Sequence, residues 1–106
     1  MFLMNYDAGQ GWHDPRIVPY GPLSLEPSCM VFHYAQELFE GMKAYRTPEG
    51  KVQLFRPMEN ALRFDSSCER MCVPAIDPDF FVDAVKALVK VDQAWVPNKK
   101  GASLYI

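Results

Sequence analysis

The chain has 106 residues, a formal net charge of −2 at pH 7 and a hydrophobic fraction of 49%. At this length folding buries only about 60–68% of the unfolded surface, so we expect one small soluble domain with a thin core. The slightly acidic charge argues against a nucleic-acid or anionic-membrane binder, which needs a basic patch. No apolar run approaches the roughly 20 residues that span a bilayer, and we see no secretory leader. Three cysteines cannot all pair within the chain, which favours a reducing, cytoplasmic setting.

The two ends of the chain are unusual for a complete domain. The chain opens on an apolar run at residues 1–4 and closes on residues 103–106, which are typical of a strand. Natural domains usually end in frayed polar residues. We therefore expect the 106 residues to be a piece of a longer protein.

The first forty residues predict little regular structure apart from one helix. Residues 5–16 hold Asn, Asp, Gly and an Asp-Pro pair, which indicate turn and loop. Several prolines confine residues 16–27 to edge strands or to an irregular crossing segment. Apolar residues over 30–42 recur at the spacing of one helix face, which predicts a helix that Gly41 interrupts.

The remaining residues predict a hairpin, two helices and a last strand. Two extended runs around a Gly-containing turn predict a β-hairpin over about residues 41–56. A helix over 57–72 has Pro at its first turn and an apolar stripe of Met58, Ala61, Leu62, Cys68, Met71 and Cys72. A second helix opens on the N-cap residue Asp77 and has a buried face of Phe81, Ala84, Val85, Leu88 and Val91. With a strand over 102–106, the sum is an α+β fold, an antiparallel sheet with two packed helices.

The usual local signatures of catalysis and metal binding are absent. No Cys-x-x-Cys or His-x-x-x-His spacing exists for a zinc site, so we predict no metal ligands and interpret the three cysteines as buried, inert thiols. There is no glycine-rich phosphate loop. Because His13 and His33 have no evident serine or cysteine partner, we interpret both as structural. We therefore assign no catalytic residue.

Five residues allow either a structural or a binding interpretation. Arg63 lies among apolar neighbours, where a guanidinium is either a snorkelling surface group or an anion ligand with a fork of donors. Phe39 and Gly41 form either a core residue with a bulge or a close backbone approach to a ligand. The hydroxyls of Tyr34 and Tyr105 either satisfy a local acceptor or reach a pocket.

Taken together, these stretches resemble a known family. The signature of the branched-chain amino-acid aminotransferases, which are fold-type IV pyridoxal-phosphate enzymes, is similar to the segment His33-Tyr34-x-x-x-Leu38-Phe39-Glu40-Gly41-Met42-Lys43-Ala44-Tyr45. The pattern covers nearly the whole chain in order, with the segments Gly11-Trp12-x-x-Pro15-Arg16-Ile17, Leu54-Phe55-Arg56-Pro57-x-x-Asn60-x-x-Arg63, Val91-Asp92-x-x-Trp95-Val96-Pro97 and Gly101-x-Ser103-Leu104-Tyr105-Ile106. Such long motifs are more specific than a lone glycine triplet.

The resemblance implies a function and a set of site residues. The function is transfer of an amino group between leucine, isoleucine or valine and 2-oxoglutarate, by a cytoplasmic homodimer that holds pyridoxal 5'-phosphate. Arg63 occupies the position that grips the cofactor phosphate. Phe39 and Gly41 match positions that line the pocket for the substrate's aliphatic side chain, and Tyr105 matches a position near the substrate carboxylate. Tyr34 matches a residue that reaches the neighbouring subunit's pocket, and Lys43 matches a basic position near the pocket.

The resemblance also implies that residues 1–106 are a truncated N-terminal small domain. The family's Schiff-base lysine and an arginine directly after Ile106 are expected beyond the chain, so the chain alone would be inactive. The helix near His33 shortens to one turn, followed by a strand from Phe39 to Tyr45. Two alternatives stay open: a fold-type IV aminodeoxychorismate lyase or D-amino-acid aminotransferase, and a stand-alone interaction domain without chemistry.

Overall fold

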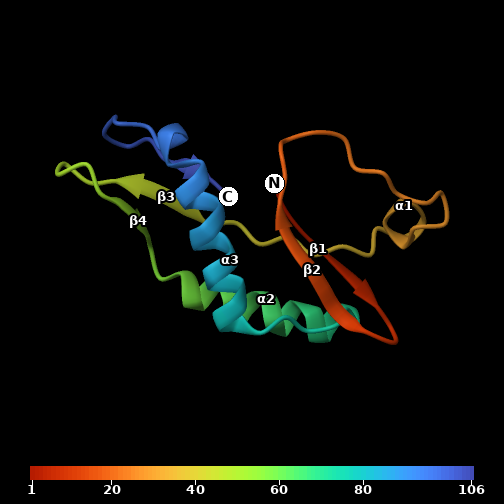
Figure 1. The fold of residues 1–106 in the computed structure, drawn as a ribbon. Coiled ribbons are helices and arrows are strands. Elements are labelled where there is room, and N and C mark those ends of the chain that lie inside the picture. Colours follow the sequence, from red (N-terminus) through yellow and green to blue (C-terminus); the bar gives the residue numbers. More distant parts are fainter. The chain divides into compact units, whose positions relative to one another are not determined.

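The computed structural model describes the whole chain, residues 1–106, and its contacts fall into two compact units. The first unit is Met1–Leu38 and the second is Phe39–Ile106. Each unit has its own small antiparallel sheet and at least one helix. Figure 1 shows these helices and strands, coloured from the N-terminus to the C-terminus. This combination is α+β, which confirms the predicted class, but the strands form two sheets where the sequence predicted one.

A β-hairpin forms the start of the first unit. Strand β1, Phe2–Asp7, pairs antiparallel with β2, Gly11–Ile17. The directly opposed rings of Tyr6 and Trp12 pack edge-on with their centroids 5.1 Å apart. The prediction of turn and loop over residues 5–16 is therefore confirmed only at residues 8–10, which form the turn between the strands, and is wrong for the rest. Pairing between the two strands holds these residues extended. The local propensities of single residues do not include this cross-strand interaction.

The Asp-Pro pair that indicated a loop sits in a bulge of this hairpin. The register shifts between Leu3 and Asn5, so that Asp14 and Pro15 lie opposite the single residue Met4. Asp14 takes a left-handed conformation with a φ of 53°. Pro15 has no N–H to donate, so it fits where the ladder bonds are interrupted.

Between β2 and the second unit, the only regular element is the short helix α1. Residues 18–29 form no helix or strand, as expected for an irregular segment with several prolines. α1 spans Met30–Tyr34 and ends at Ala35, whose φ of 47° is left-handed. The helix predicted over 30–42 is therefore wrong beyond residue 34, and the single helical turn near His33 is confirmed. Because none of its side chains is buried, no packing extends the helix.

The second unit contains a three-stranded antiparallel sheet in the order β4-β3-β5. The strands are β3 at Lys43–Arg46, β4 at Val52–Leu54 and β5 at Leu104–Tyr105. The predicted hairpin and last strand are thus confirmed. The strand implied from Phe39 onward is wrong at its start, because β3 begins only at Lys43. Met42 still pairs with Ile106 through two backbone hydrogen bonds of 2.9 and 3.1 Å.

The two longer helices begin and end close to the predicted residues. α2 spans Pro57–Met71 and α3 spans Pro78–Val91, and a 3-10 turn, η1, follows at Gln93–Trp95. The predicted N-cap is confirmed, since the Asp77 carboxylate accepts a hydrogen bond from the Phe80 amide at 2.8 Å. The helices contact each other through the rings of Phe64 and Phe81, whose centroids are 4.9 Å apart.

The core of the second unit joins β3 to α3 and to the segment after it. Ala44, Val89 and Val96 are buried together, and the side chains packed around them are Val52, Leu54, Val85, Leu104 and Ile106. The centre of the core is therefore the contact of one sheet face with α3, as expected for a helix that covers a sheet.

The predicted apolar faces of both helices need correction. The buried residues of α3 are Val82 and Val89, which the prediction omitted, and Val91 is exposed. Leu62 of α2 and Cys72, which directly follows α2, are exposed although both were placed on the apolar stripe of the predicted helix. Helical periodicity shows that a face exists, but the packing partner decides which residues form its centre.

Arg46 joins the β3–β4 hairpin to the segment that follows α3. Its guanidinium donates to the carbonyl oxygens of Val96 at 3.1 Å, Gln93 at 2.6 Å and Gly50 at 3.1 Å. Gln93 is the first residue of η1, Val96 directly follows η1, and Gly50 lies in the hairpin turn. One side chain therefore ties the sheet to the end of the helix that covers it.

Candidate functional site

Two aromatic side chains close on the backbone of Gly41. A Cβ atom at this position would stand 2.8 Å from the hydroxyl oxygen of Tyr105 and 3.4 Å from Cζ of Phe39. A carbon atom cannot approach an oxygen to 2.8 Å without repulsion, so only glycine leaves the tyrosine hydroxyl in this place. The structure thus brings together three of the residues predicted to bind substrate.

A small hollow of about 210 Å³ opens beside these residues. Lys43 lies directly opposite Tyr105 in the β3–β5 ladder, so the two side chains share one face of the sheet. The full lining is Gly41, Met42, Lys43, Tyr45, Phe55, Asn60 and Tyr105. An ammonium group, hydroxyl groups and aromatic surface together suit a small molecule that has a carboxylate and an apolar part.

Glu40 and Arg63 form a bidentate ion pair next to this hollow. Nε of Arg63 donates to Oε2 of Glu40 at 2.8 Å, and Nη2 donates to Oε1 at 2.5 Å. The glutamate side chain is only 7% exposed, whereas the arginine side chain is 63% exposed. Because a bidentate pair fixes both the position and the plane of a guanidinium, Arg63 is held in one orientation while much of it faces solvent.

Asn60 connects the ion pair to the hollow that it lines. Its side-chain nitrogen donates to Oε1 of Glu40 at 2.8 Å and to the carbonyl oxygen of Gly41 at 3.1 Å. The Gly41 amide donates to the same carboxylate oxygen at 3.0 Å. Asn60 and Arg63 lie three residues apart on α2, a spacing that places both on one side of the helix.

This network stabilises the charged forms of both partners. Hydrogen bonding from Arg63 lowers the pKa of the Glu40 carboxyl below its ordinary value, although burial raises it, and Asn60 and Gly41 lower it further. The same pair raises the pKa of Arg63. Glu40 is therefore an anion and Arg63 a cation at neutral pH.

Tyr34 and the two histidines belong to the first unit. Tyr34 is the last residue of α1 and its side chain is exposed, and its predicted contact with a neighbouring subunit stays a prediction. Nε2 of His13 pairs with the Asp7 carboxylate at 2.6 Å, across the hairpin. Nε2 of His33 bonds to the carbonyl oxygen of Pro27 at 2.7 Å. These local contacts fit the structural interpretation of both histidines.

The cysteines differ from one another in exposure. Cys68 is buried, Cys29 is half-buried and Cys72 is exposed, so the prediction of three buried thiols is wrong for Cys72. Burial raises the pKa of the Cys68 thiol, and the nearby Asp65 adds to the effect. Cys68 is therefore a poor nucleophile at neutral pH.

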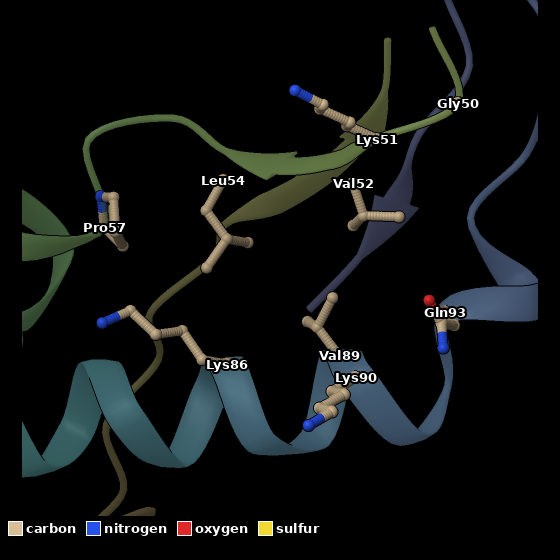
Figure 2. Close-up of a pocket in the computed structure, with 9 residues that line it drawn as sticks. All are labelled: Gly50, Lys51, Val52, Leu54, Pro57, Lys86, Val89, Lys90 and Gln93. Carbon is tan, nitrogen blue, oxygen red and sulfur yellow. The ribbon is translucent and has the colours of Figure 1, made fainter.

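A larger hollow of about 690 Å³ lies between β4 and α3. Figure 2 shows Val52 and Leu54 facing Val89 across it, while Lys51 points away from them. None of the predicted site residues lines this hollow, and its floor is the edge of the core. Because its lysines point in different directions (Figure 2), it does not form a convergent binding site.

Glu40 and Asn60 have no role in the sequence predictions, although they organise the site. A signal was present in the sequence, because a carboxylate among apolar residues needs a partner when it is buried. Tyr45 and Phe55 also line the hollow without having been predicted. The alternation of side chains in a strand, which groups residues 43 and 45 on one face, could have identified Tyr45.

Over its whole length, the chain is similar to known branched-chain-amino-acid aminotransferases. It is 55% identical over 106 residues to branched-chain-amino-acid transaminase 1 of Bacillus subtilis. It is 50% identical over 107 residues to a probable branched-chain-amino-acid aminotransferase of Streptomyces coelicolor. It is 48% identical over 106 residues to the cytosolic branched-chain-amino-acid aminotransferase of Saccharomyces cerevisiae. These matches confirm the resemblance found from the motifs.

The chain spans about 30% of the length of the curated relatives that it matches, namely 30% of the two bacterial proteins and 28% of the yeast protein. No family model matches the chain. None of its helices is long and apolar enough to cross a membrane.

Proposed function

We propose that the chain is the N-terminal small domain of a fold-type IV, pyridoxal-phosphate-dependent aminotransferase. The parent protein would move an amino group between leucine, isoleucine or valine and 2-oxoglutarate. Similarity along the entire chain to proteins named for branched-chain transamination supports this substrate class. Within the structure, the proposal rests on the fixed guanidinium of Arg63 beside the small hollow at Gly41.

Arg63 suits one side of a phosphate-binding site. Glu40 occupies the Nε–Nη2 edge of its guanidinium, which leaves donors on Nη1 and Nη2 for an anion. A dianionic phosphate binds best to cationic donors that are already fixed, because ordering a flexible side chain costs entropy. When bound, pyridoxal 5'-phosphate supplies the electron sink that allows the α-carbon of an amino acid to lose a proton.

The residues around Gly41 suit the amino-acid substrate. The Phe39 ring, which lies beside Gly41, gives an apolar wall for a branched aliphatic side chain. The Tyr105 hydroxyl and the Lys43 ammonium lie on one sheet face and can bind the substrate carboxylate. Tyr34, from the first unit, would line the pocket of the neighbouring subunit in a cytoplasmic homodimer.

The remaining parts of the site are assigned to the parent protein. The lysine that moves the proton, and an arginine that binds the substrate carboxylate, would lie beyond residue 106. The chain by itself would then hold part of the phosphate grip and part of the pocket but would not catalyse transamination. A cytosolic relative in yeast supports the cytoplasmic location.

The complete gene product tests this proposal. We expect it to turn yellow with pyridoxal 5'-phosphate, to give a lysine adduct on borohydride reduction, and to transfer an amino group from glutamate to 2-oxoisocaproate. Failure to trap a lysine adduct would contradict the proposal. Turnover of aminodeoxychorismate in place of 2-oxoisocaproate would favour a lyase. A stop codon directly after Ile106 would favour a stand-alone interaction domain.

A further inference from the structure

Glu40 contacts both halves of the candidate site. It binds Arg63, the proposed phosphate ligand, and it accepts a hydrogen bond from the amide of Gly41, the residue against whose Cα the Tyr105 hydroxyl packs. Both contacts come from one carboxylate whose side chain is 7% exposed. Glu40 therefore links the proposed phosphate ligand to the backbone beside Tyr105.

The pair with Glu40 determines which donors of Arg63 remain for an anion. A guanidinium has five N–H donors in one rigid plane. Glu40 takes one donor from Nε and one from Nη2. The Nη1–Nη2 edge can then make a second bidentate pair with a phosphate, and the rigidity of the plane fixes the direction of this edge.

Glu40 exerts two opposing effects on an anion at Arg63. Its negative charge repels the anion, whereas its two hydrogen bonds hold the guanidinium ready to bind. Exposure of 63% of the Arg63 side chain to water weakens the repulsion. Without the pair, a long and exposed arginine side chain would have to lose rotamer freedom on binding. A positioning role requires this ordering of Arg63 to outweigh the repulsion.

We propose that Glu40 is a positioning residue of the cofactor site. Its carboxylate holds Arg63 in the orientation that binds a phosphate. By accepting a hydrogen bond from the Gly41 amide, the same carboxylate also links Arg63 to the backbone at the proposed substrate pocket. The role rests on the proposed function, since it presupposes a phosphate at Arg63. From α2, the Asn60 side chain donates to the same carboxylate oxygen and to the carbonyl oxygen of Gly41.

The test compares three variants of the complete gene product with the wild type. Glu40→Gln keeps the length of the side chain but turns an NH2 group toward the donors of Arg63. Glu40→Asp keeps the charge but is one methylene shorter. Glu59→Gln is the matched control, because Glu59 is an exposed residue of α2 that pairs with Arg56. Dissociation constants are measured for pyridoxal 5'-phosphate and for pyridoxal, which lacks the phosphate.

We expect both Glu40 variants to bind pyridoxal 5'-phosphate on the order of tenfold more weakly, and pyridoxal as tightly as the wild type. The Glu59→Gln control should match the wild type for both ligands. A general packing role would weaken both ligands alike and would overturn the proposal. Unchanged binding of pyridoxal 5'-phosphate by Glu40→Gln would also overturn it, because the carboxylate would then make no net contribution. Tighter binding would overturn it as well, because repulsion would then outweigh positioning.

Failure of the proposed function itself would look different. The wild type would then bind no pyridoxal 5'-phosphate, or Arg63→Gln would bind it as tightly as the wild type does. If Glu40→Gln loses its cooperative thermal transition, Glu40→Asp decides the question, because it retains the buried charge. Binding of pyridoxal 5'-phosphate by Glu40→Asp at the wild-type level would then reject the positioning role.

Discussion

The Glu40 carboxylate and the Arg63 guanidinium meet in a two-bond ion pair across 23 residues of sequence. Glu40 lies in the segment before β3 and Arg63 lies on α2. The acid is largely buried and the base is largely exposed, so the pair presents a cation of fixed orientation at the surface. Such a cation beside a hollow is the feature that the proposed phosphate contact requires.

The lowered pKa of Glu40 predicts that the contribution of this pair to stability depends on pH. The carboxyl has a lower pKa in the folded chain than its ordinary value of 4.5. Its contribution is therefore complete above about pH 4.5 and is lost as the pH falls through the lowered value. We expect Glu40→Gln to reduce the free energy of unfolding at neutral pH and to approach the wild type in acid. Urea unfolding of the complete gene product measures this, and a difference that widened in acid would contradict it.

Replacement of Gly41 by alanine should displace Tyr105 and weaken substrate binding. The new methyl group would stand 2.8 Å from the tyrosine hydroxyl. Because Tyr105 is 60% exposed and can move, we expect little change in Tm. If the proposed function is correct, the KM of the complete gene product for leucine should rise on the order of tenfold, which corresponds to about 1.4 kcal/mol of lost binding.

A double-mutant cycle tests the cause of that rise. Tyr105→Phe removes the atom nearest to position 41, so Gly41→Ala should cost less in the Tyr105→Phe background than in the wild type. Gly21→Ala is the control, since no atom lies within 4 Å of its new methyl group. Equal costs in the two backgrounds would show that contact with the hydroxyl is not responsible.

Arg46→Lys should destabilise the second unit. A single ammonium group cannot donate to the carbonyls of Val96, Gln93 and Gly50 in the geometry that the guanidinium satisfies. We expect a loss of about 1–3 kcal/mol in the free energy of unfolding, seen as a lower denaturation midpoint. Arg56→Lys alters one exposed ion pair and should change stability by less than about 0.5 kcal/mol. Similar losses in the two variants would argue against the role of Arg46.

The cysteines should react with thiol reagents in the order of their exposure. Cys72 is exposed, whereas Cys68 is buried and its pKa is raised. Peptide mass mapping after labelling of the native protein should show Cys68 modified more than about tenfold more slowly than Cys72. The two should become equivalent in denaturant. Fast modification of Cys68 in the native protein would contradict its buried position.

Elements whose signals are local could be predicted well from the sequence. The helices after residue 56 have proline at the first turn, and Asp77 provides an N-cap within its own segment. The β3–β4 hairpin follows from its Gly-containing turn. The β1–β2 hairpin could not be predicted in this way, because Asp14 and Pro15 indicate a loop until pairing places them in a bulge.

The α+β class, the likeness to branched-chain aminotransferases, and the candidates Arg63, Gly41 and Tyr105 could all be derived from the sequence alone. The fold was needed to show that Glu40 and Asn60 link Arg63 to the Gly41 backbone, beside the Tyr105 hydroxyl. The hydrogen bonds that Asn60 and Arg63 donate to Glu40 span 20 and 23 positions of sequence. Periodicity along a chain indicates which residues share a face, but the partner of a buried carboxylate depends on how α2 and the segment before β3 meet in space.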